Sequence, residues 1–87
     1  MKIKPDFILK KIAGSYVVVP IRSAAVNFNA VIKLSETGAL LWERLSRGAE
    51  KSELVDALLS EYDVDEETAS RDVDKFLSKL KEADLVE

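Results

Sequence analysis

The feature that most constrains the fold is a change in hydrophobic pattern near Leu34. Before that point the chain carries short runs of β-branched and aromatic residues, which are typical of strands. We expect strands at 7–12, 15–19 and 30–34, with Val26 as an alternative start of the third and 22–25 as a connection. Gly14 suits a tight turn between the first two strands. Pro20 ends the second strand because it has no N–H to donate.

After Leu34 apolar residues recur every three or four positions, which predicts helices. Ser35 is a good N-cap for the first helix, and Gly48 stands where a left-handed residue ends it. Glu50 and Ser52 are both open as the cap of the second helix, and Asp65 begins the third. The three apolar stripes are Ala39, Leu41, Trp42 and Leu45; Leu54, Val55, Leu58, Leu59 and Tyr62; and Ala69, Val73, Phe76, Leu77 and Leu80, after which Leu85 and Val86 return to the core.

The expected order is therefore β-β-β-α-α-α. A small sheet has one face that needs cover, and three amphipathic helices can provide it. This order predicts an α+β fold in which a three-stranded antiparallel sheet is followed by three helices, with winged-helix-like proportions. A chain of 87 residues is too short for two cores, so we expect residues 1–87 to form a single domain.

Composition excludes several kinds of chemistry. The chain has no cysteine and no histidine, which rules out disulfides, thiolate nucleophiles, zinc–thiolate sites and imidazole acid–base catalysis. No apolar run approaches the roughly 20 residues that span a bilayer. The lysines near the N-terminus are not followed by the apolar run of a signal peptide. We therefore expect a cytoplasmic protein.

Charge is unevenly distributed along the chain. Residues 1–47 carry eight Lys/Arg and three Asp/Glu, for a net charge of +5, whereas residues 48–87 carry five and thirteen, for −8. An acidic half is poor material for a phosphate-binding surface, because nucleic-acid affinity comes largely from Lys and Arg. We expect no nucleic-acid partner.

The acidic run 63–67 invites comparison with a calcium loop. Thr68 stands where such a loop needs glycine for its sharp turn, so a helix N-terminus with acids in its first turn is the better interpretation. The other carboxylates fall mostly on exposed helix faces, and the three glycines are isolated rather than grouped in a phosphate loop. We expect no metal, no cofactor and no catalytic residue, so the chain is not interpreted as an enzyme.

Two further features have a structural and a functional interpretation. Trp42 shares a helical face with Ala39 and Leu45, so core packing is favoured over stacking on a ligand. Several lysines lie in or near the first strand, and a solvated outer face is favoured over a binding patch. These lysines are Lys2, Lys4, Lys10 and Lys11.

The stretch from Leu34 to Leu45, LSETGALLWERL, resembles the L-N-E-T-G-A-x-x-W-E-x-L signature of the PqqD family. The stretch 58–65 resembles the end of that family's second helix, and residues 72–73 and 76–80 resemble its third helix. The resemblance runs from about Phe7 to Val86. Two positions depart from the family's usual residues: Ser35 replaces Asn, which caps helices equally well, and Asp84 replaces Gly, although Asp tolerates the left-handed conformation.

The resemblance implies a RiPP recognition element, a domain that binds the leader of a ribosomally made precursor peptide. Such a domain presents the leader to a modifying enzyme, often a radical S-adenosylmethionine (SAM) enzyme. In the family the leader adds as a strand to the third strand and its side chains enter the groove beside the third helix. The peptide-binding residues implied for this chain are Ala30, Val31, Ile32, Lys33, Leu34, Arg71, Lys75, Phe76, Lys79 and Leu80.

The physics of this region is compatible with strand addition. The third strand is last in an antiparallel meander and should have a free edge, whose main-chain groups can bind an extended peptide. Phe76 and Leu80 are the expected apolar floor. Arg71, Lys75 and Lys79 form a row that can attract an acidic leader, although pairing with Asp72, Asp74 and Glu82 is an equally good interpretation.

Two other classes of function remain open at this point. A winged-helix DNA-binding protein needs a basic exposed face on its third helix, and here that helix begins with Asp65, Glu66 and Glu67. A scaffold subunit that binds only its partner enzyme is the second alternative. The precursor, the product, the partner's reaction and the oligomeric state are not encoded in a recognisable pattern, and pyrroloquinoline quinone itself is not implied.

Overall fold

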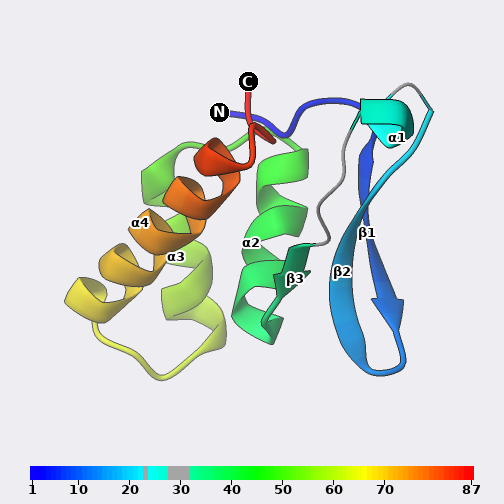
Figure 1. Cartoon of the computed structure of the whole chain (residues 1–87). Coiled ribbons are helices and arrows are strands. Elements are labelled where there is room, and N and C mark those ends of the chain that lie inside the picture. The colour runs from blue at the N-terminus through cyan, green and yellow to red at the C-terminus, as the bar shows by residue number, and fades with distance from the viewer. Residues whose placement is uncertain (23, 28–31) are drawn as a thin grey trace.

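The computed structural model describes residues 1–22, 24–27 and 32–87. Two strands, a short helix, a third strand and three longer helices follow one another along the chain (Figure 1). They are β1 (Phe7–Ile12), β2 (Ser15–Pro20), α1 (Ala24–Asn27), β3 (Ile32–Leu34), α2 (Glu36–Ser46), α3 (Lys51–Glu61) and α4 (Glu66–Glu82). The expected α+β fold, with an antiparallel sheet followed by three helices, is confirmed.

The segment before β3 differs from the sequence-based expectation. Val26 is not a strand start, because it lies in α1, and the predicted connection at 22–25 is partly helical. Ala24 and Ala25 begin this helix, and alanine has the highest helix propensity. The described part of the third strand begins at Ile32, while Ala30 and Val31 lie outside the described residues.

The sheet has the order β1-β2-β3, and both strand pairs are antiparallel. Ala13 and Gly14 both have positive φ, at 51° and 83°, which is the backbone of the two-residue hairpin turn that matches strand twist. Leu9, Val18 and Ile32 are consecutive register partners and lie on the same face of the sheet. Val18 and Ile32 are buried, so this face is the one that packs against the core.

One hydrophobic core joins the sheet to all three long helices. Trp42, at 4% exposed, lies in that core together with Val18, Leu58 and Leu80, as the helical stripes predict. Leu59 is an exception: it is 37% exposed and lies outside the core. Leu54, Val55 and Leu58 already occupy the buried side of α3, and the residue after Leu58 turns toward solvent.

Local chemistry explains where the helices begin. The Ser35 hydroxyl accepts from Gly38 N at 3.1 Å, which confirms Ser35 as the N-cap of α2. For α3 the cap is Glu50, whose backbone N–H donates to Glu53 Oε1 at 3.0 Å as part of a capping box. Asp65 caps α4.

Gly48 and Asp84 have φ of 85° and 59°, so both adopt the left-handed conformation expected after α2 and α4. The chain then returns along its own N-terminal segment, where Ile3 forms an isolated antiparallel bridge with Val86. Leu85 is fully buried, as the sequence predicts. Among the described residues, no helix is both long and apolar enough to cross a bilayer.

Candidate peptide-binding site

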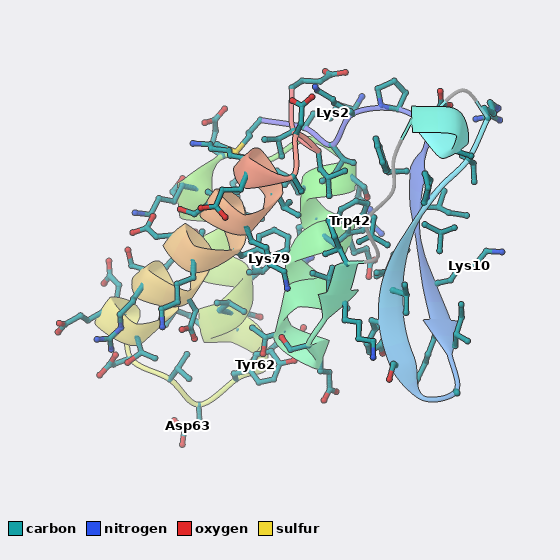
Figure 2. The ribbon with its side chains drawn as sticks, in the orientation of Figure 1. Lys2, Lys10, Trp42, Tyr62, Asp63 and Lys79 are labelled. Carbon is teal, nitrogen blue, oxygen red and sulfur yellow. The ribbon has the colours of Figure 1, made fainter. Side chains whose placement is uncertain are left out.

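The outer edge of β3 is open to a further strand, because β3 is the last strand of the sheet. Lys33 is paired with Val17, and its carbonyl oxygen accepts a hydrogen bond from Lys79 Nζ at 2.9 Å. Figure 2 shows Lys79 between α4 and β3, on the side of β3 away from β2. The carbonyl that it bonds therefore points away from β2. Residues of an antiparallel strand alternate in direction, and the N–H and C=O of one residue point to the same side. Lys33 therefore presents both groups to the open edge.

A groove runs beside this edge, with a volume of about 310 Å³. It has three walls: the end of β3, the first turns of α2, and the middle of α4. We call it the β3 groove. Its lining residues are Leu34, Ser35, Thr37, Gly38, Leu41, Asp72, Lys75, Phe76 and Lys79.

Gly38 allows α2 to begin close to β3. A Cβ atom at this position would lie 3.3 Å from Leu34 Cβ and 3.5 Å from the Ser35 hydroxyl oxygen. The first distance is tighter than ordinary packing, so a larger residue would have to push Leu34 and the strand end outward. The glycine thus positions one wall of the β3 groove against another.

The structure brings together part of the predicted site. Leu34, Lys75, Phe76 and Lys79 line the β3 groove, and Lys33 is joined to Lys79 by the hydrogen bond described above. Phe76 is 7% exposed, so most of it is packed in the core although it also lines the groove.

Ile32 and Leu80 are placed differently from the rest. Ile32 is buried on the core face of β3, and Leu80 is 0% exposed. Leu80 is therefore enclosed by the core and has no surface of its own to offer a peptide. Ala30 and Val31, also predicted as site residues, lie outside the described part of the chain.

The predicted cationic row on α4 is divided. Lys75 and Lys79 line the β3 groove, whereas Arg71 lines a separate depression with Glu66, Glu67 and Asp74. The alternative interpretation of the row is pairing with acids of the same helix. Asp74, one of those acids, instead pairs with Lys51 of α3 at 2.8 Å. Asp72 is the carboxylate that shares the β3 groove with the two lysines.

Sequence reasoning missed the contribution of α2. Thr37, Gly38 and Leu41 form a wall of the β3 groove, whereas the sequence pattern predicts Leu41 for the core and no binding role for Thr37 or Gly38. A signal was available: these residues follow the predicted third strand directly, so their first turn must lie next to its end. No pattern within the sequence connects them to α4.

A larger hollow of about 710 Å³ lies between β1 and the helices α2 and α3. We call it the β1 hollow; it is lined by Phe7, Ile8, Leu9, Tyr16, Glu36, Ala39, Leu40, Trp42, Glu43, Ser46, Glu61 and Tyr62. Its three charged residues are all carboxylates. Size alone favours this hollow, but the β3 groove has what a peptide strand needs, an open edge with an outward carbonyl.

Trp42 borders the β1 hollow but is almost fully buried, so its expected role in the core is confirmed. The lysines near the first strand do not form one patch. Lys2 and Lys10 lie far apart, near the chain termini and on the hairpin respectively (Figure 2). Lys4 pairs with Asp84 at 2.6 Å, and Lys11 lies 5.3 Å from the centre of the Tyr16 ring.

The acidic run at 63–67 behaves as a helix start. Thr68 N donates to Asp65 Oδ1 at 2.7 Å, and the hydrogen bonds from Thr68 hold the pKa of the Asp65 carboxyl below its ordinary value. Over the described ranges, no group of three or more acidic side chains is arranged to hold a metal ion.

Comparison with protein families gives a match over residues 15–86 to the family described as coenzyme PQQ synthesis protein D (PqqD). The chain belongs to the PqqD family. The matched residues run from β2 to the C-terminal bridge and include every wall of the β3 groove.

Two solved structures resemble this PqqD-family chain over nearly all of its length. One is TbiB1 in complex with the TbiA(beta) leader peptide, with 30% identity, a TM-score of 0.78, and coverage of 100% of this chain and 95% of that chain. The other is lasso peptide synthetase B1 complexed with the leader peptide, with 26% identity, a TM-score of 0.76, and coverage of 99% and 95%. A comparison with curated proteins finds no match.

Proposed function

We propose that this PqqD-family protein recognises the leader segment of a ribosomally made precursor peptide and presents it to a separate modifying enzyme, such as a radical SAM protein. The observation that carries the proposal is the coincidence of two facts. The two solved structures similar over the whole chain are complexes with leader peptides, and this chain has an open strand edge beside a groove.

In this proposal the leader adds as a fourth strand to β3. Lys33 offers an outward N–H and C=O, and the binding segment extends over residues 30–34. Main-chain hydrogen bonds of this kind give affinity that depends little on sequence, while pockets for alternate side chains give selectivity. Phe76 forms the accessible floor of the pocket, and Leu80 supports it from the core.

Charge supports an acidic rather than a basic leader. Lys75 and Lys79 line the β3 groove, whose lining contains one carboxylate, that of Asp72. Lys33 is also exposed, and its carbonyl oxygen accepts from Lys79 Nζ. Exposed cations of this kind mainly steer and select, because each surface pair contributes only about 0.2–1 kcal/mol. Arg71 lies beyond the groove and acts at most on a longer leader.

The protein itself leaves the precursor chemically unchanged in this proposal. Across the described residues, no charged side chain is buried, so no carboxylate sits in the kind of dry pocket where acid–base catalysis is set up. We propose that residues 1–87 act as a single binding module in the cytoplasm, without metal or cofactor. Incubation of the purified protein with precursor should give no mass change, and elemental analysis showing about one transition metal per chain would overturn this part.

The winged-helix DNA-binding alternative is disfavoured by α4. Its N-terminal end carries Glu66 and Glu67 beside Arg71, which opposes a phosphate backbone. A gel-shift titration should show only weak binding to duplex DNA. Sub-micromolar, sequence-dependent affinity near physiological salt would favour the DNA-binding function instead.

The test of leader recognition is an NMR titration of the labelled protein. The probes are the chain's own precursor and the TbiA(beta) leader peptide of the similar TbiB1 complex. Shift changes should concentrate on residues 30–34 and 71–80. Changes confined to β1 or α3, with the β3 groove unaffected, would contradict the proposal and support a scaffold that binds only its partner enzyme.

A further inference from the structure

In the peptide-free protein, the side chain of Lys79 covers the open edge of β3 at Lys33. Lys79 Nζ donates to the carbonyl oxygen of Lys33 at 2.9 Å, although the two residues are 46 positions apart. This carbonyl is the outward acceptor that an added strand would use. The ammonium group therefore stands where the N–H of a leader residue would have to approach.

Strand addition requires the ammonium group to leave that position or to share the carbonyl. Lys79 is exposed, so its ammonium can return to water, and its four-carbon chain can swing without disturbing α4. Breaking the hydrogen bond between Lys79 and Lys33 costs little free energy, but it lowers the affinity of every leader. A leader that offers the displaced ammonium a new acceptor recovers that cost.

We propose that Lys79 is a removable cover of the β3 edge and that it selects leaders with a carboxylate next to the residue that pairs with Lys33. This inference rests on the leader-recognition function proposed above. It identifies the substrate class more narrowly: an extended peptide with Asp or Glu at one defined place in the register.

The surroundings of Lys79 favour an acceptor supplied by the leader. The neighbouring cation of the row, Lys75, is of like charge, and Asp72 lies about two helical turns away on α4. Glu82 lies one helical turn from Lys79, toward the C-terminus. A helical ion pair is weaker when the lysine precedes the glutamate in the sequence than when it follows it. The Lys79 ammonium bonds the Lys33 carbonyl rather than either acid.

The two roles of Lys79 have opposite effects on neutral and acidic leaders. For a neutral leader, the bond to Lys33 lowers the fraction of protein with an open edge, and the apparent affinity falls by that fraction. For a leader with a suitably placed carboxylate, the same ammonium contributes an ion pair. Removing the ammonium should therefore raise the affinity for neutral leaders and lower the affinity for acidic leaders. Simple electrostatic attraction does not predict the gain for neutral leaders.

The first experiment tests the cover in the protein alone. Lys79→Met removes the ammonium and keeps an unbranched apolar chain, so the ¹³C shift of the Lys33 carbonyl should change. Lys81→Met is the matched control: it removes the same charge from the same exposed helix, but two positions away, and residues so spaced do not face the same side. An unchanged Lys33 carbonyl in the Lys79→Met protein would overturn the proposal.

The second experiment tests selection with peptides of known sequence. Each residue of the TbiA(beta) leader peptide is replaced in turn by Glu and, in parallel, by Gln, and affinities are measured for wild type, Lys79→Met and Lys81→Met. For wild type and Lys81→Met, the peptide with Glu should bind about two- to fivefold tighter than the peptide with Gln, as expected for an exposed ion pair. This preference should occur only at the leader positions on one or both sides of the residue that pairs with Lys33. In Lys79→Met that preference should disappear.

The Gln peptides provide the decisive arm. Lys79→Met should bind them about two- to threefold more tightly than wild type, because an exposed hydrogen bond no longer competes. Weaker binding of the Gln peptides would mean that Lys79 and the leader share the carbonyl, and a Glu preference that survives in Lys79→Met would assign selection to another residue; either result overturns the proposal. Failure of wild type to bind any peptide of the set would instead count against leader recognition itself.

Discussion

The two edges of the sheet are covered in different ways. The β1 edge carries its own exposed lysines, Lys10 and Lys11, within the strand. The β3 edge instead receives a lysine from α4, which bonds the outward carbonyl of Lys33. Lysines in an edge strand are a common means of preventing unwanted pairing. Lys10 and Lys11 are part of β1 and remain at its edge. Lys79 belongs to α4, so its side chain can move away from the β3 edge.

The hollows next to the two edges also differ in charge. The charged side chains that line the β1 hollow are the carboxylates of Glu36, Glu43 and Glu61. Those lining the β3 groove are Lys75 and Lys79 with Asp72. The β1 hollow thus repels an acidic peptide and the β3 groove attracts it, although both have apolar residues in their walls. Charge and edge access together, rather than hollow size, distinguish the two regions.

The largest expected effect concerns the β1 hollow. Trp42→Ala should lower the free energy of unfolding by about 3–5 kcal/mol, because Trp42 is a large aromatic residue packed in the core. That is a large share of the roughly 5–15 kcal/mol typical of a domain. Denaturant melts measure it, with Leu59→Ala as an exposed control that should change stability little. A loss under about 1 kcal/mol for Trp42→Ala would make the β1 hollow a binding surface and remove the contrast.

The next effect compares the edges directly. Lys33→Pro should weaken leader binding roughly tenfold or more, because proline deletes the outward N–H and its ring obstructs an approaching strand. The hydrogen bonds between β2 and β3 are spared, since the main-chain N–H and C=O of Lys33 point away from β2. Calorimetric titration measures the affinity, and circular dichroism checks that the fold survives.

The matched control is Lys11→Pro on β1. Ile21 N donates to Asp6 O at 2.8 Å, and counting alternate pairs from there places the main-chain groups of Lys11 on the side away from β2. Lys11→Pro should therefore leave leader binding unchanged. The reverse outcome, loss with Lys11→Pro and none with Lys33→Pro, would move the peptide to the β1 edge.

A smaller effect tests charge. Reversing Lys75 and Lys79 to Glu should weaken binding of an acidic leader about fivefold at low ionic strength, and by less than about twofold near 1 M salt, where the screening length is only about 3 Å. Reversing Lys10 and Lys11 makes the same change in net charge on the other edge and should have little effect. Equal losses from both pairs would show that net charge alone attracts the leader.

The smallest effect concerns the start of α4, the helix that carries the groove lysines. Hydrogen bonds from Thr68 lower the pKa of Asp65 in the folded state, so its contribution to stability is present above the unfolded pKa of about 4 and is lost as the pH falls through the lower folded value. Asp65→Ala should thus be slightly less stable than wild type at pH 7. The difference should narrow below about pH 4, and melts at the two pH values measure it; a constant difference would assign the effect to something other than the carboxylate.

Local patterns in the sequence determined the elements and their ends. Ser35 and Asp65 cap the helices that they precede, and Gly48 and Asp84 adopt the left-handed conformation expected of them. These features depend on neighbours a few positions away, which is the range over which capping and periodicity act. The exception is α1, where a four-residue helix is too short to produce a recognisable period.

Only the tertiary structure decided which residues of a predicted stripe or row reach the candidate site. Phe76 and Leu80 share one apolar stripe, yet Phe76 lines the β3 groove and Leu80 is enclosed by the core. Lys79 and Arg71 share one cationic row, yet only Lys79 reaches β3. The periodicity of a helix specifies which side of it is apolar or charged. How far along that side a neighbouring strand extends depends on the packing of β3, α2 and α4 against one another, and these contacts join residues far apart in the chain.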